Sequence, residues 1–88
     1  MRPVEWLLEM TQSERGYSDL LDQAGGLAAA AWRLARAKCE VREHATGVPT
    51  RLEVKAAARE LSRRLGLGEV PPSAVLRRDC EALGLLVL

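Results

Sequence analysis

His44, Cys39 and Cys80 are the residues best suited to metal binding or catalysis. A zinc site needs about four such ligands at close spacing, whereas these three are too few and too far apart in the sequence. His44 has no evident partner for acid–base chemistry, and no glycine-rich loop follows a strand-like segment to cradle a phosphate. We therefore expect no metal, no cofactor and no enzyme activity.

The two cysteines also bear on the cellular compartment. Cys39 falls on the apolar face of a predicted helix rather than at a helix N-terminus, where a thiol becomes reactive. Acidic residues come too early for a secretion signal, and no apolar run reaches the ~20 residues that span a membrane. We expect Cys39 and Cys80 to be free, buried thiols of a cytoplasmic protein with no membrane partner.

The basic residues are concentrated in one part of the chain and follow a regular spacing there. Between residues 51 and 78, seven basic residues stand against three acids, a local charge of +4, whereas residues 5–22 carry −4 and the whole chain only +1. A ridge of bases along one helix face is typical of a surface that follows a phosphate backbone. It is also typical of a solvated helix face, or of a helix that packs on the acidic N-terminal segment. The bases that recur every fourth residue are Arg51, Lys55, Arg59 and Arg63.

Local signals predict four helices that would position these residues. The first two are expected at residues 4–11, after Pro3, and at residues 19–44, with Ser18 as the N-cap. Gly25-Gly26 interrupts the second helix, and two adjacent glycines cost about 2 kcal/mol relative to alanine. They mark either a weak point in one helix or a break between two, and we expect one helix with a weak point.

The last two helices have clearer ends. Thr50 and Glu53 match a capping box, so the third helix is expected at residues 51–65, where Gly66 ends it. Ser73 is expected to cap the fourth helix, at residues 73–83, with Gly84 as its stop signal. The apolar tail at residues 85–88 is expected to form a short strand or an extended segment packed on the helices.

The composition predicts an all-α bundle that forms a single domain over residues 1–88. Hydrophobic residues make up 48% of the chain but aromatic residues only 3%, so the core must consist of leucine, alanine and valine. Closely packed helices suit such a core, and 88 residues suffice for one compact domain. Six leucines on the apolar helix faces are expected to share the core: Leu27, Leu34, Leu61, Leu65, Leu76 and Leu83.

Residues 58–86 resemble the helix-turn-helix of DeoR-type winged-helix repressors. The matching segments are Glu60-Leu61-Ser62, Leu65-Gly66-Leu67, Arg77-Arg78-Asp79 and Gly84-Leu85-Leu86. The connector at residues 68–72 is longer than the tight turn of that family. The resemblance implies that the two C-terminal helices of the bundle form a helix-turn-helix-like pair.

The resemblance also implies that duplex DNA is the partner. Arg77 and Arg78, on the last helix, would reach base edges or phosphates in the major groove. The alternative is that these arginines are solvated and pair with Glu81 and other acids. The remaining residues that the resemblance implies in DNA binding are the backbone contacts on the third helix and the first residue of the reading helix: Arg59, Arg63, Arg64 and Ser73.

Alanine-rich residues 28–37 form a thin, smooth helix surface that suits either the core or a second copy of the chain. We therefore expect a small DNA-binding or DNA-associated accessory protein that regulates transcription, with a homodimer or a helical protein as a further partner. The alternative is a non-enzymatic adaptor or assembly subunit of a larger complex, such as a phage structure. It would bind protein through the alanine-rich face and the leucine-rich tail.

Overall fold

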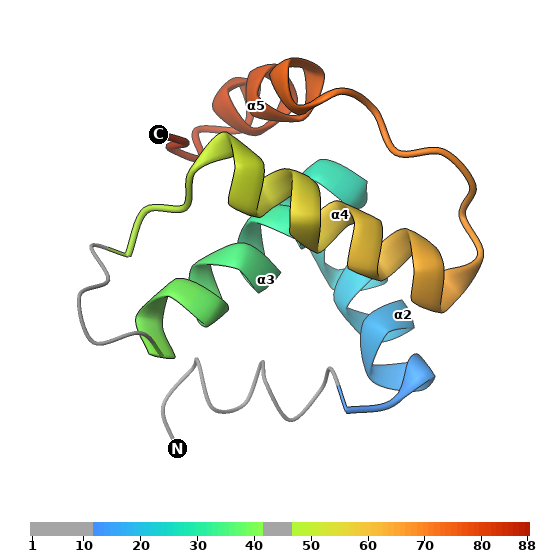
Figure 1. The fold of residues 1–88 in the computed structure, drawn as a ribbon. Helices are drawn as coiled ribbons and strands as arrows, with labels where there is room; N and C mark the ends of the chain where they lie inside the picture. The colour runs from blue at the N-terminus through green and yellow to red at the C-terminus, as the bar shows by residue number, and fades with distance from the viewer. Residues whose placement is uncertain (1–11, 42–46) are drawn as a thin grey trace.

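A computed structural model describes residues 12–41 and 47–88, and all the regular secondary structure in these ranges is α-helical (Figure 1). The all-α prediction is therefore confirmed, whereas the helix predicted at residues 4–11 lies outside the described ranges. None of the described helices is long and apolar enough to cross a membrane. The helices are α2 (Glu14–Ala24), α3 (Leu27–Val41), α4 (Arg51–Leu65) and α5 (Ser73–Ala82).

The prediction of one long helix at residues 19–44 is wrong, because the chain turns sharply between α2 and α3. Gly25 adopts a left-handed conformation, with φ of +81°, and its N–H donates to the carbonyl of Leu21. A residue with a Cβ atom adopts this conformation only at an energetic cost, so the first glycine of the pair is well suited to end α2. The turn lets α2 fold back onto α3 instead of extending it.

The start of α2 also differs from the prediction. Ser13, rather than Ser18, is the N-cap, and its hydroxyl accepts a hydrogen bond of 3.1 Å from the N–H of Gly16. The predicted helix begins only at residue 19, after Ser18. The helix nevertheless includes residues 14–17, because the Ser13 cap supports its first turn and Tyr17 is buried in the core.

The capping box of α4 is confirmed. The Thr50 hydroxyl accepts from the N–H of Glu53 at 3.2 Å, and the Glu53 carboxylate accepts from the N–H of Thr50 at 3.0 Å. The helix ends at Gly66, which is left-handed and donates its N–H to the carbonyl of Ser62. These two ends fix the direction of α4 and therefore the direction of its basic ridge.

The predicted capping role of Ser73 is wrong. Pro72 occupies the N-cap position of α5, and no side chain caps the helix. Ser73 is already the first helical residue, because the carbonyl of Pro72 accepts from the N–H groups of Val75 and Leu76 and so closes the first turn. At the other end, α5 stops at Ala82, one residue earlier than expected.

The hydrophobic core lies where α3 packs against the three other described helices. Leu34, Leu61 and Leu76 are fully buried as predicted, while Leu27 and Leu65 are partly buried at its edge. The prediction for Leu83 is wrong, since this side chain is 63% exposed. The chain leaves α5 just before it, and Val87 of the tail enters the core instead.

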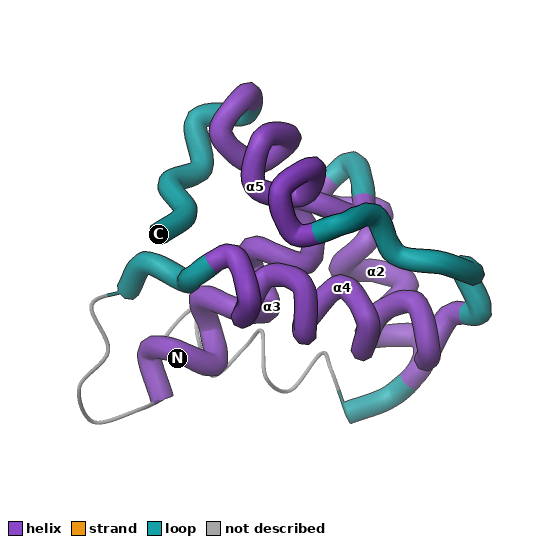
Figure 2. The backbone as a smooth tube through the Cα atoms, turned by 45° about the horizontal axis from the view of Figure 1, so that its top comes forward, coloured by secondary structure: helices purple, strands orange, loops and turns teal. Residues whose placement is uncertain are grey.

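The C-terminal tail is an extended segment packed on the helices and not a strand. The N–H of Leu88 donates to the carbonyl of Pro49, and the carbonyl of Leu88 accepts from the N–H of Arg51, both at 3.0 Å. The indole N–H of Trp32 donates to the carbonyl of Leu86 at 2.8 Å. Figure 2 shows the tail beside the loop that leads into α4. These bonds hold the tail against the start of α4 and against α3.

Candidate nucleic-acid interface

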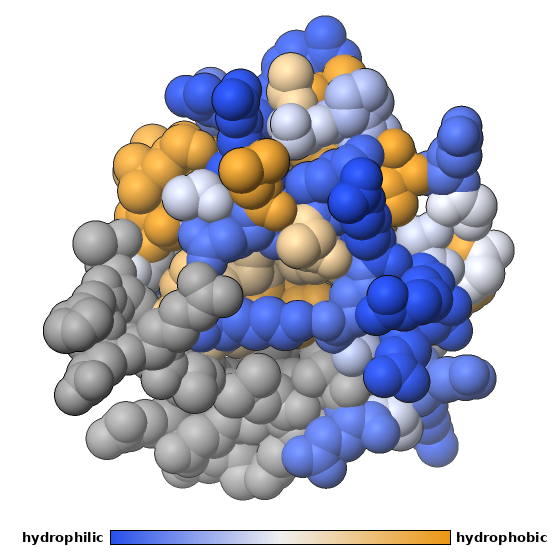
Figure 3. Space-filling model, in the orientation of Figure 1, coloured by the Kyte–Doolittle hydropathy of each residue, from blue (hydrophilic) through white to orange (hydrophobic). Residues whose placement is uncertain are grey.

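The basic ridge of α4 faces solvent. Arg51, Arg59 and Arg63 are exposed, and Lys55 is partly buried. The opposite face of α4 is packed against α3, because Val54, Ala57, Ala58 and Leu61 recur on it and are all buried. The amphipathic pattern of the helix therefore forces the ridge outwards. In Figure 3 hydrophilic side chains cover much of the surface at the C-terminal half of α4.

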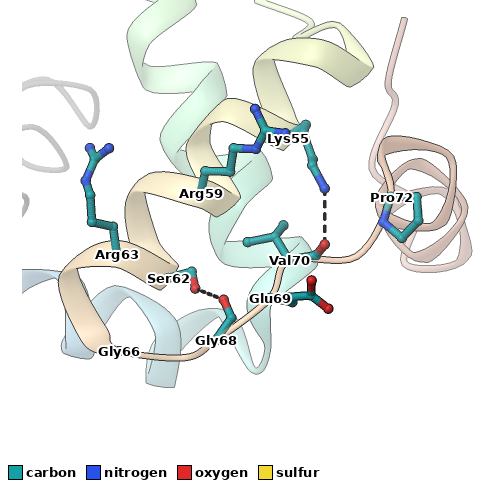
Figure 4. A pocket seen from close by; sticks show the side chains of 9 residues that line it. All are labelled: Lys55, Arg59, Ser62, Arg63, Gly66, Gly68, Glu69, Val70 and Pro72. Atoms are coloured by element: carbon teal, nitrogen blue, oxygen red, sulfur yellow. Dashed lines mark hydrogen bonds between the residues drawn. The ribbon is translucent and has the colours of Figure 1, made fainter.

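An open groove runs between α4 and the connector, which in the structure spans residues 66–72, from the end of α4 to the start of α5. Its volume is about 890 Å³. Figure 4 shows that Lys55 reaches the connector, whereas the guanidinium groups of Arg59 and Arg63 point away from it. The residues lining the groove are Lys55, Arg59, Ser62, Arg63, Gly66, Gly68, Glu69, Val70 and Pro72.

Two side chains of α4 attach the connector to the helix. The Lys55 ammonium donates to the carbonyls of Val70 at 3.1 Å and Pro71 at 2.6 Å. The Ser62 hydroxyl donates to the carbonyl of Gly68. Buried or half-buried carbonyls need donors, and the prolines of this connector have no N–H that could pair them internally. The connector is longer than the turn of a helix-turn-helix. It is nevertheless attached to α4 at Gly68, Val70 and Pro71.

Sequence reasoning placed Lys55 in the basic ridge but missed this bond to the connector. The available signal was the Pro71-Pro72 pair, which removes two backbone donors and leaves nearby carbonyls to be satisfied by side chains. Nothing in the sequence pattern identified Lys55 as the donor, because the contact depends on the path of the connector. Sequence reasoning also did not identify Glu69 as a residue of this site, although it lines the groove from the connector side.

Arg77 and Arg78 lie on the exposed side of α5. Leu76 and Cys80 face the core from the other side, and the Cys80 thiol donates to the carbonyl of Ala28 at 3.4 Å. The guanidinium of Arg77 donates to the Glu81 carboxylate at 2.7 Å. Both side chains of this pair are about half exposed, and such a surface pair contributes about 0–1 kcal/mol. A phosphate or a base edge can therefore displace Glu81 at little cost.

Ser73 and Arg64 occupy different surroundings from the other candidate residues. Ser73 is partly buried at the start of α5, directly after Pro72 of the groove lining. Arg64 does not line the groove, because its guanidinium lies over the ring of Tyr17, 5.6 Å from the ring centre. The structure therefore brings Arg59 and Arg63 together on one groove and directs Arg64 towards α2.

Tyr17, Lys38 and Glu60 form a polar cluster that joins α2, α3 and α4. The Tyr17 hydroxyl and the Lys38 ammonium each donate to the Glu60 carboxylate. Burial favours the neutral form of Glu60, but the hydrogen bonds from Lys38 and Tyr17 outweigh it and lower its pKa. Burial and the bond to Glu60 raise the pKa of Tyr17. Sequence reasoning did not find this cluster, whose members are too far apart in the chain for any local pattern.

The described residues include no group of three or more histidine, cysteine or acidic side chains placed to hold a metal ion. Cys39 and Cys80 are buried and form no disulfide, and the Cys39 thiol donates to the Glu53 carboxylate at 2.9 Å. Burial raises the pKa of Cys80, which disfavours the reactive thiolate.

Comparisons with known protein families, with curated proteins and with solved structures found no significant match to this sequence. The candidate interface therefore stands on the geometry and chemistry of α4, the connector and α5.

Proposed function

We propose that this protein is a non-enzymatic DNA-binding accessory protein that contacts duplex DNA with α4 and α5. The observation that carries the proposal is the placement of two sets of exposed arginines on two helices that pack against each other. Arg77 and Arg78 of α5 enter the major groove, while Arg59 and Arg63 of α4 contact phosphates. The bonds from Lys55 and Ser62 to the connector support a fixed arrangement of these helices.

The charge distribution supports a focused interface. The whole chain carries only +1, so long-range attraction to DNA is weak and the affinity must come from local contacts. A homodimer would double these contacts. The proposal includes binding as a homodimer, a role in transcription regulation and a place in the cytoplasm.

The test is a titration of labelled mixed-sequence duplex DNA at low salt. The Arg77→Ala/Arg78→Ala double variant removes the two basic residues of α5. Its matched control is Arg15→Ala/Arg33→Ala, which makes the same charge change at exposed residues of α2 and α3. We expect Arg77→Ala alone to weaken binding by about 1–3 kcal/mol if this side chain contacts a base.

Two outcomes contradict the proposal. One is the absence of wild-type binding at tens of micromolar protein. The other is equal binding by the wild type, the α5 double variant and the control. In either case the candidate surface of α5 is not a DNA-binding surface.

A second candidate function is that of a protein adaptor, favoured by exposed leucines around the C-terminal tail. Leu86 and Leu88 are 62% and 59% exposed, and Leu52, at the start of α4, is 69% exposed. Figure 3 shows a hydrophobic area on this side of the molecule. An exposed patch of large apolar side chains is typical of a protein-binding surface.

The alanine-rich surface of α3 does not support the adaptor candidate. Ala30, Ala31, Ala35 and Ala37 are all buried in the core of the monomer, so a partner would have to use the leucines. Light scattering of the wild type and of Leu86→Glu/Leu88→Glu tests self-association. An adaptor that binds its own copy forms a larger species only in the wild type, and a monomeric wild type rejects that form of the candidate.

A further inference from the structure

We infer that the groove between α4 and the connector holds one sugar-phosphate strand of the bound duplex, with Arg59 and Arg63 as its phosphate ligands. This inference rests on the proposed DNA binding and assigns a location to one strand. Both arginines line the groove, and their side chains are exposed. No ion pair or hydrogen bond ties either guanidinium to another residue of the described ranges. Their donors are therefore free to bind phosphate oxygens.

The spacing of the two arginines fits a strand that runs along the helix. Residues four apart lie about 6 Å apart along a helix axis and on the same side of it. Each DNA strand carries one phosphate per ~3.4 Å of duplex axis. Two neighbouring phosphates of one strand are therefore within reach of Arg59 and Arg63 at the same time. The guanidinium groups of Arg59 and Arg63 point away from the connector (Figure 4), so the strand lies along the open α4 edge of the groove and does not part α4 from the connector.

The other polar residues of the groove have different tasks. Lys55 and Ser62 already donate to carbonyls of Val70, Pro71 and Gly68. They hold the connector wall in place and are positioning residues rather than phosphate ligands. Arg64 is directed to the Tyr17 ring and lies outside the groove lining. The phosphate contacts of α4 are thus restricted to two of its arginines within the groove.

Glu69 opposes the strand. It is the only acidic residue in the groove lining, it is exposed, and it comes from the connector side. A carboxylate near a phosphate raises the energy of the complex, and the effect is strongest at low salt. Removal of this charge should therefore tighten DNA binding. This gain distinguishes a strand in the groove from a strand that contacts α5 alone.

The experiment measures the affinity for a labelled mixed-sequence duplex over a series of salt concentrations. Arg59→Gln and Arg63→Gln remove the proposed ligands, and Glu69→Gln removes the opposing charge. The matched controls are Arg33→Gln on α3 and Asp19→Asn on α2, both at exposed residues outside the groove lining. We expect each of the two groove arginine variants to flatten the plot of log affinity against log salt by about one unit. Glu69→Gln should bind more tightly than Asp19→Asn.

The location of the strand is checked by amide NMR shifts during the same titration. We expect the amides of Ser62, Gly66 and Gly68 to shift as duplex is added. A short polyglutamate peptide serves as a second probe for the same groove. If the peptide shifts these amides as strongly as the duplex does at equal concentration, the groove is an acidic-peptide site and the inference is overturned.

The outcomes separate this inference from the proposed function. If Arg59→Gln and Arg63→Gln behave like Arg33→Gln while the Arg77→Ala/Arg78→Ala variant loses binding, the strand does not lie in the groove and the proposed function stands. Equal affinities of Glu69→Gln and Asp19→Asn have the same meaning. If the wild type binds no duplex, the proposed function fails and the inference fails with it.

Discussion

The Tyr17 hydroxyl lies 2.5 Å from the Glu60 carboxylate and joins α2 to α4. Lys38 of α3 binds the other oxygen of the same carboxylate. One partly buried acid therefore receives donors from two other helices, and the desolvation of its charge is offset by these bonds. The cluster lies on the side of α4 that carries Arg64, and it fixes the helix whose outer face carries the basic ridge.

The stability of the protein should fall at acidic pH because of Glu60. Its pKa in the folded protein is lowered from the ordinary value of 4.5, so its stabilising contribution is complete above that value. The contribution is lost as the pH falls through the lowered pKa. Urea unfolding from neutral pH down to about pH 3 measures this loss. Glu60→Gln should show a shallower decline, whereas Glu81→Gln, which removes an exposed carboxylate, should follow the wild type.

Because of Tyr17, the stability of the protein should also fall at alkaline pH. Its folded pKa is raised above the ordinary value of 10.0, so the folded state favours the neutral phenol. The stabilising contribution is complete below that value and is lost as the pH rises through the raised pKa. Tyr17→Phe should abolish this alkaline loss. An unchanged alkaline decline in Tyr17→Phe would show that another group causes it.

Thr50 and Ser73, the residues predicted to cap α4 and α5, should differ in how much their replacement by alanine destabilises the protein. Thr50→Ala removes a hydroxyl that accepts from the N–H of Glu53, and loss of such a cap costs about 1 kcal/mol. Ser73→Ala removes no capping bond and should change the free energy of unfolding by less than about 0.5 kcal/mol. Chemical unfolding of the two variants measures the difference. Equal losses would contradict the assignment of the caps.

Two leucines that were both predicted to lie in the core should differ in how much they stabilise the protein. Leu61 is fully buried, so Leu61→Ala should destabilise the protein by about 2–4 kcal/mol. Leu83 is largely exposed, and Leu83→Ala should stay within about 0.5 kcal/mol of the wild type. Denaturant titrations of both variants provide the comparison. A small loss for Leu61→Ala would mean that the buried face of α4 is assigned wrongly.

The connector should loosen when Lys55 is changed. Lys55→Met keeps much of the apolar length of the side chain but removes the donor to the carbonyls of Val70 and Pro71. Hydrogen bonds from a charged group contribute about 1.5–3 kcal/mol when well formed, and partial exposure of this lysine reduces the figure. Hydrogen exchange should become faster at the amides of Gly68 to Val70, with α2 as the unaffected reference. Unchanged exchange in the connector would contradict the holding role of Lys55.

The features that were predictable from sequence depend on local signals. Thr50 and Glu53 are three residues apart, and Gly66 directly follows the last apolar position of α4, so both ends of this helix could be predicted. The basic ridge could be predicted because its basic residues recur at every fourth position. The start of α2 was missed because Ser13 and Ser18 are both good caps, and only the burial of Tyr17 decides between them.

The features that were not predictable depend on contacts between distant parts of the chain. The exposure of Leu83 follows from the tail, whose Val87 reaches the core although helical periodicity does not describe it. The groove likewise needs the connector to return along α4, where Lys55 and Ser62 bind it. Sequence spacing identified Arg59 and Arg63 as candidates. The resemblance added Arg64 to them and gave no sign that this side chain packs on Tyr17 of another helix.

The bond from Trp32 to the tail gives the protein a built-in optical reporter. The indole of Trp32 donates to the carbonyl of Leu86, and the guanidinium of Arg36 lies 5.4 Å from its ring centre. Indole fluorescence depends on such contacts, so release of the tail changes the emission of Trp32 even while the helices remain intact. In a Trp6→Phe background only this indole emits. Its fluorescence, followed beside the circular dichroism of the helices, distinguishes detachment of the tail from global unfolding.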